Sequence, residues 1–240
     1  MAHFQRCYQS FASFASWYNI DVNKRVFWLV FFLILVGGFI LRALPARDHN
    51  FFFKMDQADD GVYVREILER KQLVFHGSRT NIPGVYAGPL WYYFKAIGYF
   101  FSGGDPFGGV VMVILLNILL TGAIMFAVSK KVGGAEALTV GIALQFFWWF
   151  YDTSRWAFNP FPMVACAVSL ILLLSLYLGG FPPSPTASAR QGKKWFFLAA
   201  IPVALSFNFE VAGAVSLLIF YLLFTTYFFF KKKITWRGAA

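Results

Sequence analysis

Apolar runs long enough to cross a lipid bilayer constrain the fold of this chain more than any other feature. A bilayer core about 30 Å thick needs roughly 20 consecutive apolar residues in helical form. Hydrophobic residues make up 59% of the sequence and charged residues only 13%, against about 25% charged in an ordinary soluble domain. The clear runs are Val26–Leu44, Gly109–Ser129, Ala135–Tyr151, Phe161–Gly179 and Trp195–Phe230. The sequence therefore predicts an all-α integral membrane protein.

The last run is too long for one crossing, because as a single helix it would extend about 54 Å. Asn208 and Glu210 interrupt it with polar side chains. We therefore expect a hairpin of two spans with its break near 208–210, and about six transmembrane helices in all. Pro202 lies within the first arm, which is also the shorter one.

The basic residues predict the orientation. They cluster beside the apolar runs, as Arg6, Lys24, Arg25, Lys130, Lys131, Arg190, Lys193, Lys194, Lys231, Lys232, Lys233 and Arg237. With the N-terminus in the cytoplasm and six spans, all of these fall on the cytoplasmic side, as the positive-inside rule expects. The net charge of +10 therefore reads as an orientation signal of a multi-pass protein in the cytoplasmic membrane, and not as a nucleic-acid surface.

The acidic residues provide an independent observation, because the orientation rule does not use them. Nine of the eleven fall on the non-cytoplasmic side of this arrangement: Asp48, Asp56, Asp59, Asp60, Glu66, Glu69, Asp105, Asp152 and Glu210. Most of them lie in a long outer loop, residues 45–108, for which we predict two helices. Asp60–Arg70 forms the first, with Tyr63, Val64, Ile67 and Leu68 on one face.

The second predicted helix, Tyr86–Phe101, is rich in Tyr and Trp and contains Lys95. A spanning role would invert the charge pattern of all later segments, so we expect it to lie flat at the membrane surface with Lys95 reaching water. Residues 1–25 are expected to form a cytoplasmic amphipathic lead, with a surface helix at His3–Ile20. Phe181–Arg190, with three prolines, is expected to be a cytoplasmic linker.

The densest polar cluster follows the first span and contains Lys54, Asp56, Gln57, Asp59 and Asp60. One interpretation is helix capping, in which Asp59 or Asp60 accepts hydrogen bonds from free N–H groups at the start of the next helix. The other interpretation concerns Asp56, which stands a turn earlier. A carboxylate at a membrane surface beside like charges can have a raised pKa and act as a general base.

Two further positions combine charge with a membrane boundary. Arg155 follows the third span and can either pair with Asp152 or bind an anionic phosphate. Glu210 lies between two apolar arms, where an ionisable group is a functional candidate, although a solvated turn carboxylate is the alternative. The histidines and cysteines lack the spacing of a metal site, and no nucleotide-binding loop is present.

Three motifs together resemble a known superfamily. Asp56-Gln57-x-x-Asp60 opens the first outer helix, Gly88-Pro89-Leu-Trp-Tyr92-Tyr93 opens the second, and Ser154-Arg155-x3-Asn159-Pro160 follows the third span. In this order and placement they resemble the bacterial GT-C glycosyltransferases related to dolichyl-phosphate-mannose protein mannosyltransferases and lipid A sugar transferases. The resemblance covers nearly the whole chain.

The resemblance implies inverting transfer of a sugar from a polyprenyl-phosphate donor to a glycan, lipid or protein acceptor outside the cytoplasm. Asp56 would activate the acceptor hydroxyl, and Asp60 would support or orient it. The substrate-binding residues implied are Arg155, Arg79, Lys54, Tyr92, Tyr93, Asn159 and Glu210, with Arg155 the first candidate for the phosphate. The resemblance leaves a divalent metal open, because Gln57 stands where many relatives carry Glu.

Relatives in that superfamily are about twice as long, so we expect residues 26–240 to correspond to the N-terminal transmembrane module of such an enzyme. A partner chain supplying further spans is then expected. Two other functions stay open. One is a non-catalytic membrane scaffold or lipid-carrier-binding protein. The other is a small-molecule transporter, which is disfavoured because no repeated half is apparent.

Overall fold

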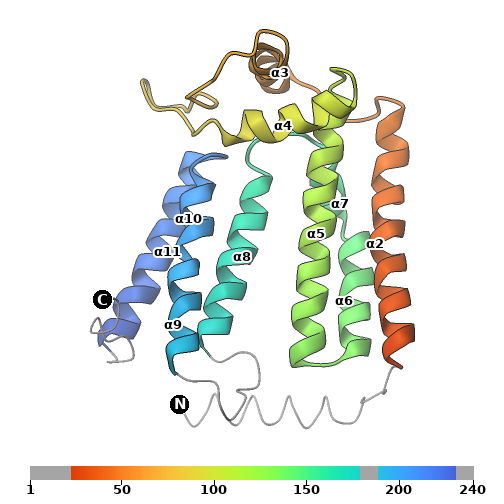
Figure 1. Ribbon diagram of the computed structural model, residues 1–240, viewed down its shortest axis with the longest axis vertical. Helices are drawn as coiled ribbons and strands as arrows, with labels where there is room; N and C mark the ends of the chain where they lie inside the picture. The colour runs from red at the N-terminus through yellow and green to blue at the C-terminus, as the bar shows by residue number, and fades with distance from the viewer. Residues whose placement is uncertain (1–22, 179–188, 231–240) are drawn as a thin grey trace.

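The computed structural model describes residues 23–178 and 189–230, and within them the chain is helical. Within the described residues, β-type pairing is limited to an isolated bridge between Arg79 and Tyr86. Long helices run side by side, and two shorter ones, α3 and α4, lie across one end of them (Figure 1). The helices are α2 (Lys24–Arg47), α3 (Met55–Leu68), α4 (Leu90–Phe101), α5 (Phe107–Lys131), α6 (Gly134–Phe146), α7 (Trp148–Ser154), α8 (Pro162–Tyr177), α9 (Ala189–Leu198), α10 (Ala200–Ser206) and α11 (Val211–Phe230).

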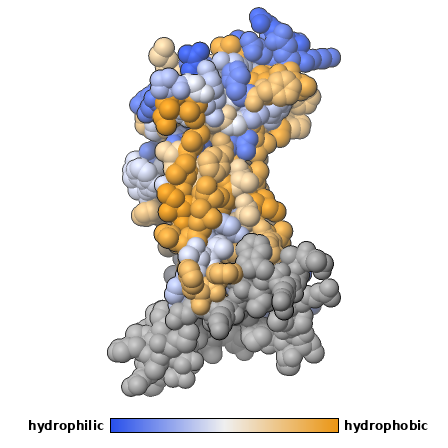
Figure 2. Space-filling model, turned by 90° about the vertical axis from the view of Figure 1, so that its left-hand side faces the viewer, coloured by the Kyte–Doolittle hydropathy of each residue, from blue (hydrophilic) through white to orange (hydrophobic). Residues whose placement is uncertain are grey.

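Three helices, α2, α5 and α11, are long and apolar enough to cross a membrane, and shorter apolar helices cover Gly134–Phe146, Pro162–Tyr177 and Lys194–Ser206. Their outer surfaces are apolar too, as Leu29, Phe32 and Leu33 on α2 show with more than half of each side chain exposed. Figure 2 shows the same pattern, with apolar side chains along the helices and hydrophilic ones gathered at the end that carries α3 and α4. An exposed apolar surface of this kind is stable against lipid, which supports a membrane protein. The count of six spans stays a prediction.

The predicted spans correspond to helices, with one correction. The run Ala135–Tyr151 does not form a single helix, because α6 ends at Phe146 and α7 begins at Trp148. Phe147 between them has an extended backbone, with φ −66° and ψ 110°. Arg42 on α2 donates a hydrogen bond to the carbonyl of Gln145 at 3.4 Å. In a continuous helix, the Gln145 carbonyl would accept a hydrogen bond from a backbone N–H group four residues later. Here the Arg42 guanidinium donates to it instead.

The predicted break in the last run is confirmed, since α10 ends at Ser206 and α11 begins at Val211. The first arm is itself divided, with α9 ending at Leu198 and α10 beginning at Ala200. Pro202 explains this division, because a proline ring clashes with the carbonyl four residues earlier, which is that of Leu198. Of the linker predicted over Phe181–Arg190, the last two residues begin α9. The rest of it and the predicted surface helix at His3–Ile20 lie outside the described residues.

The crossing helix α3 begins earlier than predicted, at Met55 instead of Asp60. The capping interpretation of Asp59 and Asp60 is therefore wrong, because both lie inside the helix. Lys54 occupies the N-cap position, and its backbone N–H donates to Gln57 Oε1 at 2.8 Å. The second helix, α4, begins at Leu90, directly after Pro89, so Tyr86–Pro89 precede it.

A hydrophobic core joins α3 and α4 to the long helices beneath them. Its buried residues are Ala46, Val64, Val74, Trp91, Tyr92, Ala96, Tyr99, Val110, Val113, Ile114, Ile118 and Ala157, and Tyr63, Ile67 and Leu68 pack against it. The predicted apolar face of the first crossing helix is thus confirmed. At the bend between α4 and α5, a Cβ atom on Gly98 would lie 2.1 Å from the carbonyl oxygen of Gly108. The two helices approach this closely because neither residue has a side chain.

The bend generates a stability prediction. Gly98→Ala places a methyl group against the Gly108 backbone, so α4 and α5 must separate, and overpacking of this kind costs about 1–3 kcal/mol. Gly37→Ala on α2 is the matched control, because a Cβ atom there meets nothing within 4 Å. Thermal unfolding of the purified protein in detergent measures both. Equal unfolding midpoints for Gly98→Ala and Gly37→Ala would contradict the close approach of α4 and α5 at Gly98.

Candidate functional site

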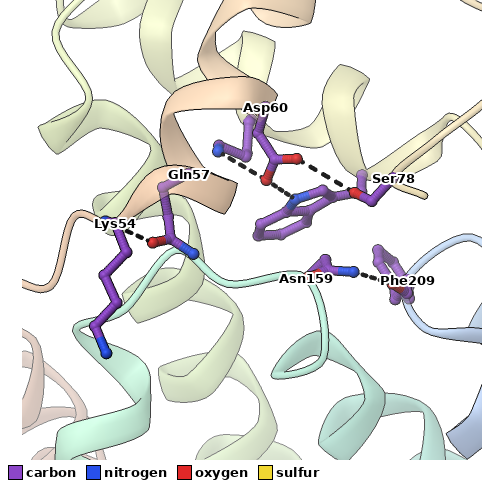
Figure 3. A network of polar contacts seen from close by, with 8 residues as sticks. Lys54, Gln57, Asp60, Ser78, Asn159 and Phe209 are labelled. Atoms are coloured by element: carbon purple, nitrogen blue, oxygen red, sulfur yellow. Dashed lines mark hydrogen bonds and ion pairs between the residues drawn. The ribbon is translucent and has the colours of Figure 1, made fainter. Parts of the chain in front are cut away.

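A buried carboxylate, that of Asp60, joins three parts of the α3–α4 end. The residue is 4% exposed. Oδ2 accepts hydrogen bonds from Trp91 Nε1 at 2.7 Å and Lys95 Nζ at 3.2 Å, and Oδ1 accepts one from Ser78 Oγ at 3.2 Å. In Figure 3 dashed lines mark these contacts of the Asp60 carboxylate, with Ser78 labelled. Asp60 therefore holds α3, the segment before α4, and α4 itself in one arrangement.

Lys95 does not reach water, so the snorkelling prediction is wrong. The side chain is completely buried and forms an ion pair with Asp60 at 3.2 Å. The Trp91 and Tyr99 rings lie 5.5 and 5.8 Å from its ammonium nitrogen. Burial lowers the pKa of Lys95, and the Asp60 carboxylate opposes this effect by stabilising the charged form. The pair explains the correction, because a buried charge is tolerated when a partner compensates for lost hydration.

Tyr92 and Tyr93, two predicted substrate contacts, are used in packing in this structure. The Tyr92 side chain is 2% exposed and stacks on Tyr63 with ring centres 4.9 Å apart. Burial raises the pKa of Tyr92 to about 12. The Tyr93 hydroxyl accepts a hydrogen bond from the Val74 N–H at 3.0 Å and donates one to the Val74 carbonyl at 3.1 Å. Tyr92 therefore packs α4 against α3, and Tyr93 holds the segment between the two helices against α4.

Asp56 lies in the first turn of α3, and its side chain is exposed. It forms no side-chain hydrogen bond or ion pair with any described residue. Lys54 precedes it by two residues and is exposed as well. The Lys54 ammonium lies 5.3 Å from the centre of the Trp156 ring. The start of α3 thus carries a carboxylate that no described side chain pairs with and, two residues earlier, an ammonium that faces the Trp156 ring.

Arg155 follows α7 and reaches the same region. It does not pair with Asp152 in the described structure. Its Nη1 donates to the Tyr151 hydroxyl at 3.1 Å, and its Nη2 donates to the backbone carbonyl of Asn50. The guanidinium carbon also lies 5.3 Å from the centre of the Tyr151 ring. Arg155 therefore connects the loop that leads into α3 with the end of α7, and only neutral groups accept its hydrogen bonds.

The remaining predicted contacts have separate positions. Asn159 Nδ2 donates to the Phe209 carbonyl at 2.9 Å, which ties the segment after α7 to the turn between α10 and α11 (Figure 3). Glu210 accepts from the backbone N–H groups of Ala212, at 2.9 Å, and Gly213, so it caps the start of α11. Arg79 is exposed and pairs through its backbone with Tyr86.

An apolar cavity of about 490 Å³ lies below this region, between α5, α8 and the α9–α10 arm. Phe94 on α4 and Phe209 contribute to its lining, and the other residues that line it are apolar with the exception of Ser169: Leu116, Pro162, Ala165, Cys166, Leu173, Leu198, Ile201, Pro202 and Leu205. The Asn159–Phe209 hydrogen bond connects one of these lining residues with the segment that carries Arg155. A chain of hydrocarbon matches the chemistry of this cavity.

Arg42 is a buried residue that the sequence reasoning missed. It lies in α2 with none of its side chain exposed. Its guanidinium donates to Ser154 Oγ at 2.9 Å, to the Gly38 carbonyl at 3.0 Å and to the side chain of Gln145. The available signal was an arginine within an apolar run, since ionisable groups in membrane spans usually have a structural or functional role.

In the part of the chain that the structure describes, no three His, Cys, Asp or Glu side chains lie together as a group that could hold a metal ion. No protein-family model, curated protein or solved structure matches the chain. The site is therefore interpreted from its own chemistry.

The Asp60–Lys95 pair generates a second prediction. Lys95→Met leaves a buried carboxylate without its counter-charge, which typically costs 3–5 kcal/mol. The double variant Asp60→Asn, Lys95→Met removes both charges, so it is expected to lose less stability than the sum of the single variants. Unfolding in detergent measures the cycle, with Lys130→Met as the exposed control. An additive cycle would mean that the two side chains do not interact.

Proposed function

We propose that this protein transfers a sugar from a polyprenyl-phosphate donor to a hydroxyl acceptor, with Asp56 as the general base. The observation that carries the proposal is the exposed, unpaired Asp56 carboxylate in the first turn of α3, two residues after Lys54 and next to the loop that Arg155 binds through the Asn50 carbonyl. Neither cation is paired with a carboxylate among the described residues. A free base next to unpaired cations suits a reaction in which a proton is removed and an anionic leaving group departs.

The transfer balances with these groups. Asp56 accepts the proton of the acceptor hydroxyl, and the oxygen forms a bond to the anomeric carbon of the sugar. The bond between that carbon and the phosphate oxygen breaks, and its electron pair leaves with the lipid phosphate. Attack from the face opposite the phosphate inverts the anomeric configuration. Lys54 and Arg155 stabilise the negative charge that develops on the departing phosphate.

The apolar cavity supports a lipid-linked donor. Each CH₂ group moved from water into apolar surroundings contributes about 0.8 kcal/mol, so a polyprenyl chain gains affinity from surfaces such as those of Phe94, Leu116 and Leu173. Asp60 has a positioning role in this proposal. Its bonds to Trp91, Lys95 and Ser78 fix α3 and hence the place of Asp56 above the spanning helices.

A lipid-carrier-binding protein without catalysis is the second candidate. The cavity favours it as much as it favours a transferase, because a hydrocarbon chain fits either function. Asp56 separates the two candidates, since only the transferase needs a base at this position.

Sugar transfer from polyprenyl-phosphate sugars to hydroxyl acceptors, measured in reconstituted membranes, tests the base. Asp56→Asn is expected to lower the rate by about 10²–10⁴-fold, the usual contribution of a general base. Asp59→Asn is the matched control, because Asp59 is also an exposed carboxylate in the same helix and is expected to keep the wild-type rate.

Equal rates for the wild type and Asp56→Asn would contradict the assignment of the base. A wild type that binds the donors but transfers none of the sugars would favour the carrier-binding protein over the transferase.

The proposal places α3 and α4 on the non-cytoplasmic face, and cysteine labelling tests this orientation. Ala58 on α3 and Lys130 at the far end of α5 are both exposed. In a background with Cys7 and Cys166 replaced by serine, Ala58→Cys is expected to react with a membrane-impermeant maleimide added outside intact cells. Lys130→Cys is expected to react only after the membrane is opened. Labelling of both from the same side would contradict the topology.

A further inference from the structure

Three buried N–H groups lack an acceptor where the start of α3 meets the segment after α7. They are Gln57 Nε2, Arg155 Nε and Trp156 Nε1, and none has a hydrogen-bond partner among the described residues. The Gln57 side chain is 1% exposed, so bulk water does not reach it. More than nine in ten buried polar groups in native proteins have a partner. Three orphan donors in neighbouring residues therefore indicate an acceptor that the chain itself does not supply.

The three groups belong to one junction because Lys54 links them. Its backbone N–H donates to Gln57 Oε1 at 2.8 Å, and its ammonium lies over the Trp156 ring at 5.3 Å. Arg155 is attached to the same loop through the carbonyl of Asn50. In Figure 3 the Lys54 side chain and the Gln57 amide nitrogen both extend toward the chain that follows α7.

The junction is positively charged. Lys54 and Arg155 are cations, and neither forms an ion pair among the described residues. A divalent cation does not fit, because it needs oxygen ligands and the unpartnered atoms are N–H donors. The Gln57 oxygen is already used by the Lys54 backbone. The missing acceptor therefore carries negative charge.

We infer that this junction binds a phosphate group through the N–H groups of Gln57, Arg155 and Trp156 and the ammonium of Lys54. A phosphate presents several acceptor oxygens in different directions, which suits donors that come from two segments of chain, and guanidinium groups bind it well. The inference rests on the proposed function in one respect, which is that the phosphate belongs to the lipid-linked donor. It adds Gln57 and Trp156 to the residues that bind substrate, and it identifies the ligand of the junction as an anion and not a metal ion.

The cavity favours a lipid-linked phosphate over a free one. Asn159, three residues after Trp156, donates to the carbonyl of Phe209, which lines the apolar cavity. A lipid chain in the cavity thus ends close to the segment that carries the orphan donors. Phe52 and Lys54 lie over Trp156, and both are exposed, so the movement of two surface side chains admits the phosphate.

Binding of polyprenyl phosphate to the full chain in detergent, measured by native mass spectrometry, tests the inference. Polyprenol of the same chain length is the comparison without phosphate. The wild type is expected to bind the phosphate form at least tenfold more tightly. Trp156→Phe keeps the ring and removes the N–H, and Gln57→Glu keeps the acceptor for Lys54 and adds a negative charge. Each is expected to lower phosphate affinity about tenfold or more and to leave polyprenol binding unchanged.

Trp148→Phe and Gln72→Glu are the matched controls, because both residues are exposed and lie outside the junction. They are expected to bind both lipids as the wild type does. Full phosphate affinity in Trp156→Phe and Gln57→Glu would overturn the inference and leave water as the acceptor. Equal affinity of the wild type for the phosphate and the alcohol would overturn it too.

Inorganic phosphate, added as a competitor, identifies the source of the phosphate. No displacement of polyprenyl phosphate at millimolar concentration supports the lipid-linked form, whereas displacement at micromolar concentration overturns it in favour of free phosphate. The assay needs no turnover, so it separates the two proposals. Loss of binding in the variants without any sugar transfer by the wild type would reject the transferase alone, and transfer with unchanged variant binding would reject this site alone.

Discussion

The buried ion pair between Asp60 and Lys95 determines where the rest of the α3–α4 end lies. Charges removed from water are stable only with close partners, and each of these two has the other at 3.2 Å. Trp91 and Ser78 donate the other two hydrogen bonds that the Asp60 carboxylate accepts. Because the pair fixes the rotation of α3, it also turns Gln57 and Val64, three and four positions away from Asp60, toward the interior. Asp56 lies on the same side of the helix but in its first turn, and its carboxylate is exposed.

The long helices could be predicted from the sequence because the length and hydropathy of a run are local properties. Gly109–Ser129 lies within α5, and the polar residues at 208–210 coincide with the turn before α11. The break at Phe147 could not be predicted in this way. The Gln145 carbonyl before the break accepts a hydrogen bond from Arg42, which lies in a different helix and 103 positions away in the sequence. A partner this distant in sequence leaves no local signal of the break.

In the candidate site, too, local features could be predicted from the sequence, whereas features that depend on distant residues could not. The polar cluster at 54–60 contains a buried carboxylate, that of Asp60, and an exposed one, that of Asp56, and composition alone did not distinguish them. A lysine in an aromatic run, such as Lys95, can either extend to water or form a buried ion pair. Which of the two it does depends on whether a carboxylate from another helix reaches it, as that of Asp60 does. Tyr92 and Tyr93 likewise resemble surface aromatics in sequence, whereas contacts with Tyr63 and Val74 draw them into the packing.

Arg42 has a consequence for the electrostatics of the whole end. Its guanidinium is completely buried, and the partners that the structure describes for it, Gly38, Gln145 and Ser154, are neutral. A buried charge is screened much less by dissolved ions than a surface charge. Arg42 therefore adds a positive charge to the interior of this end that no described carboxylate neutralises. An anionic group that binds within this interior, away from water, should be attracted to it at salt concentrations that abolish binding by surface lysines alone.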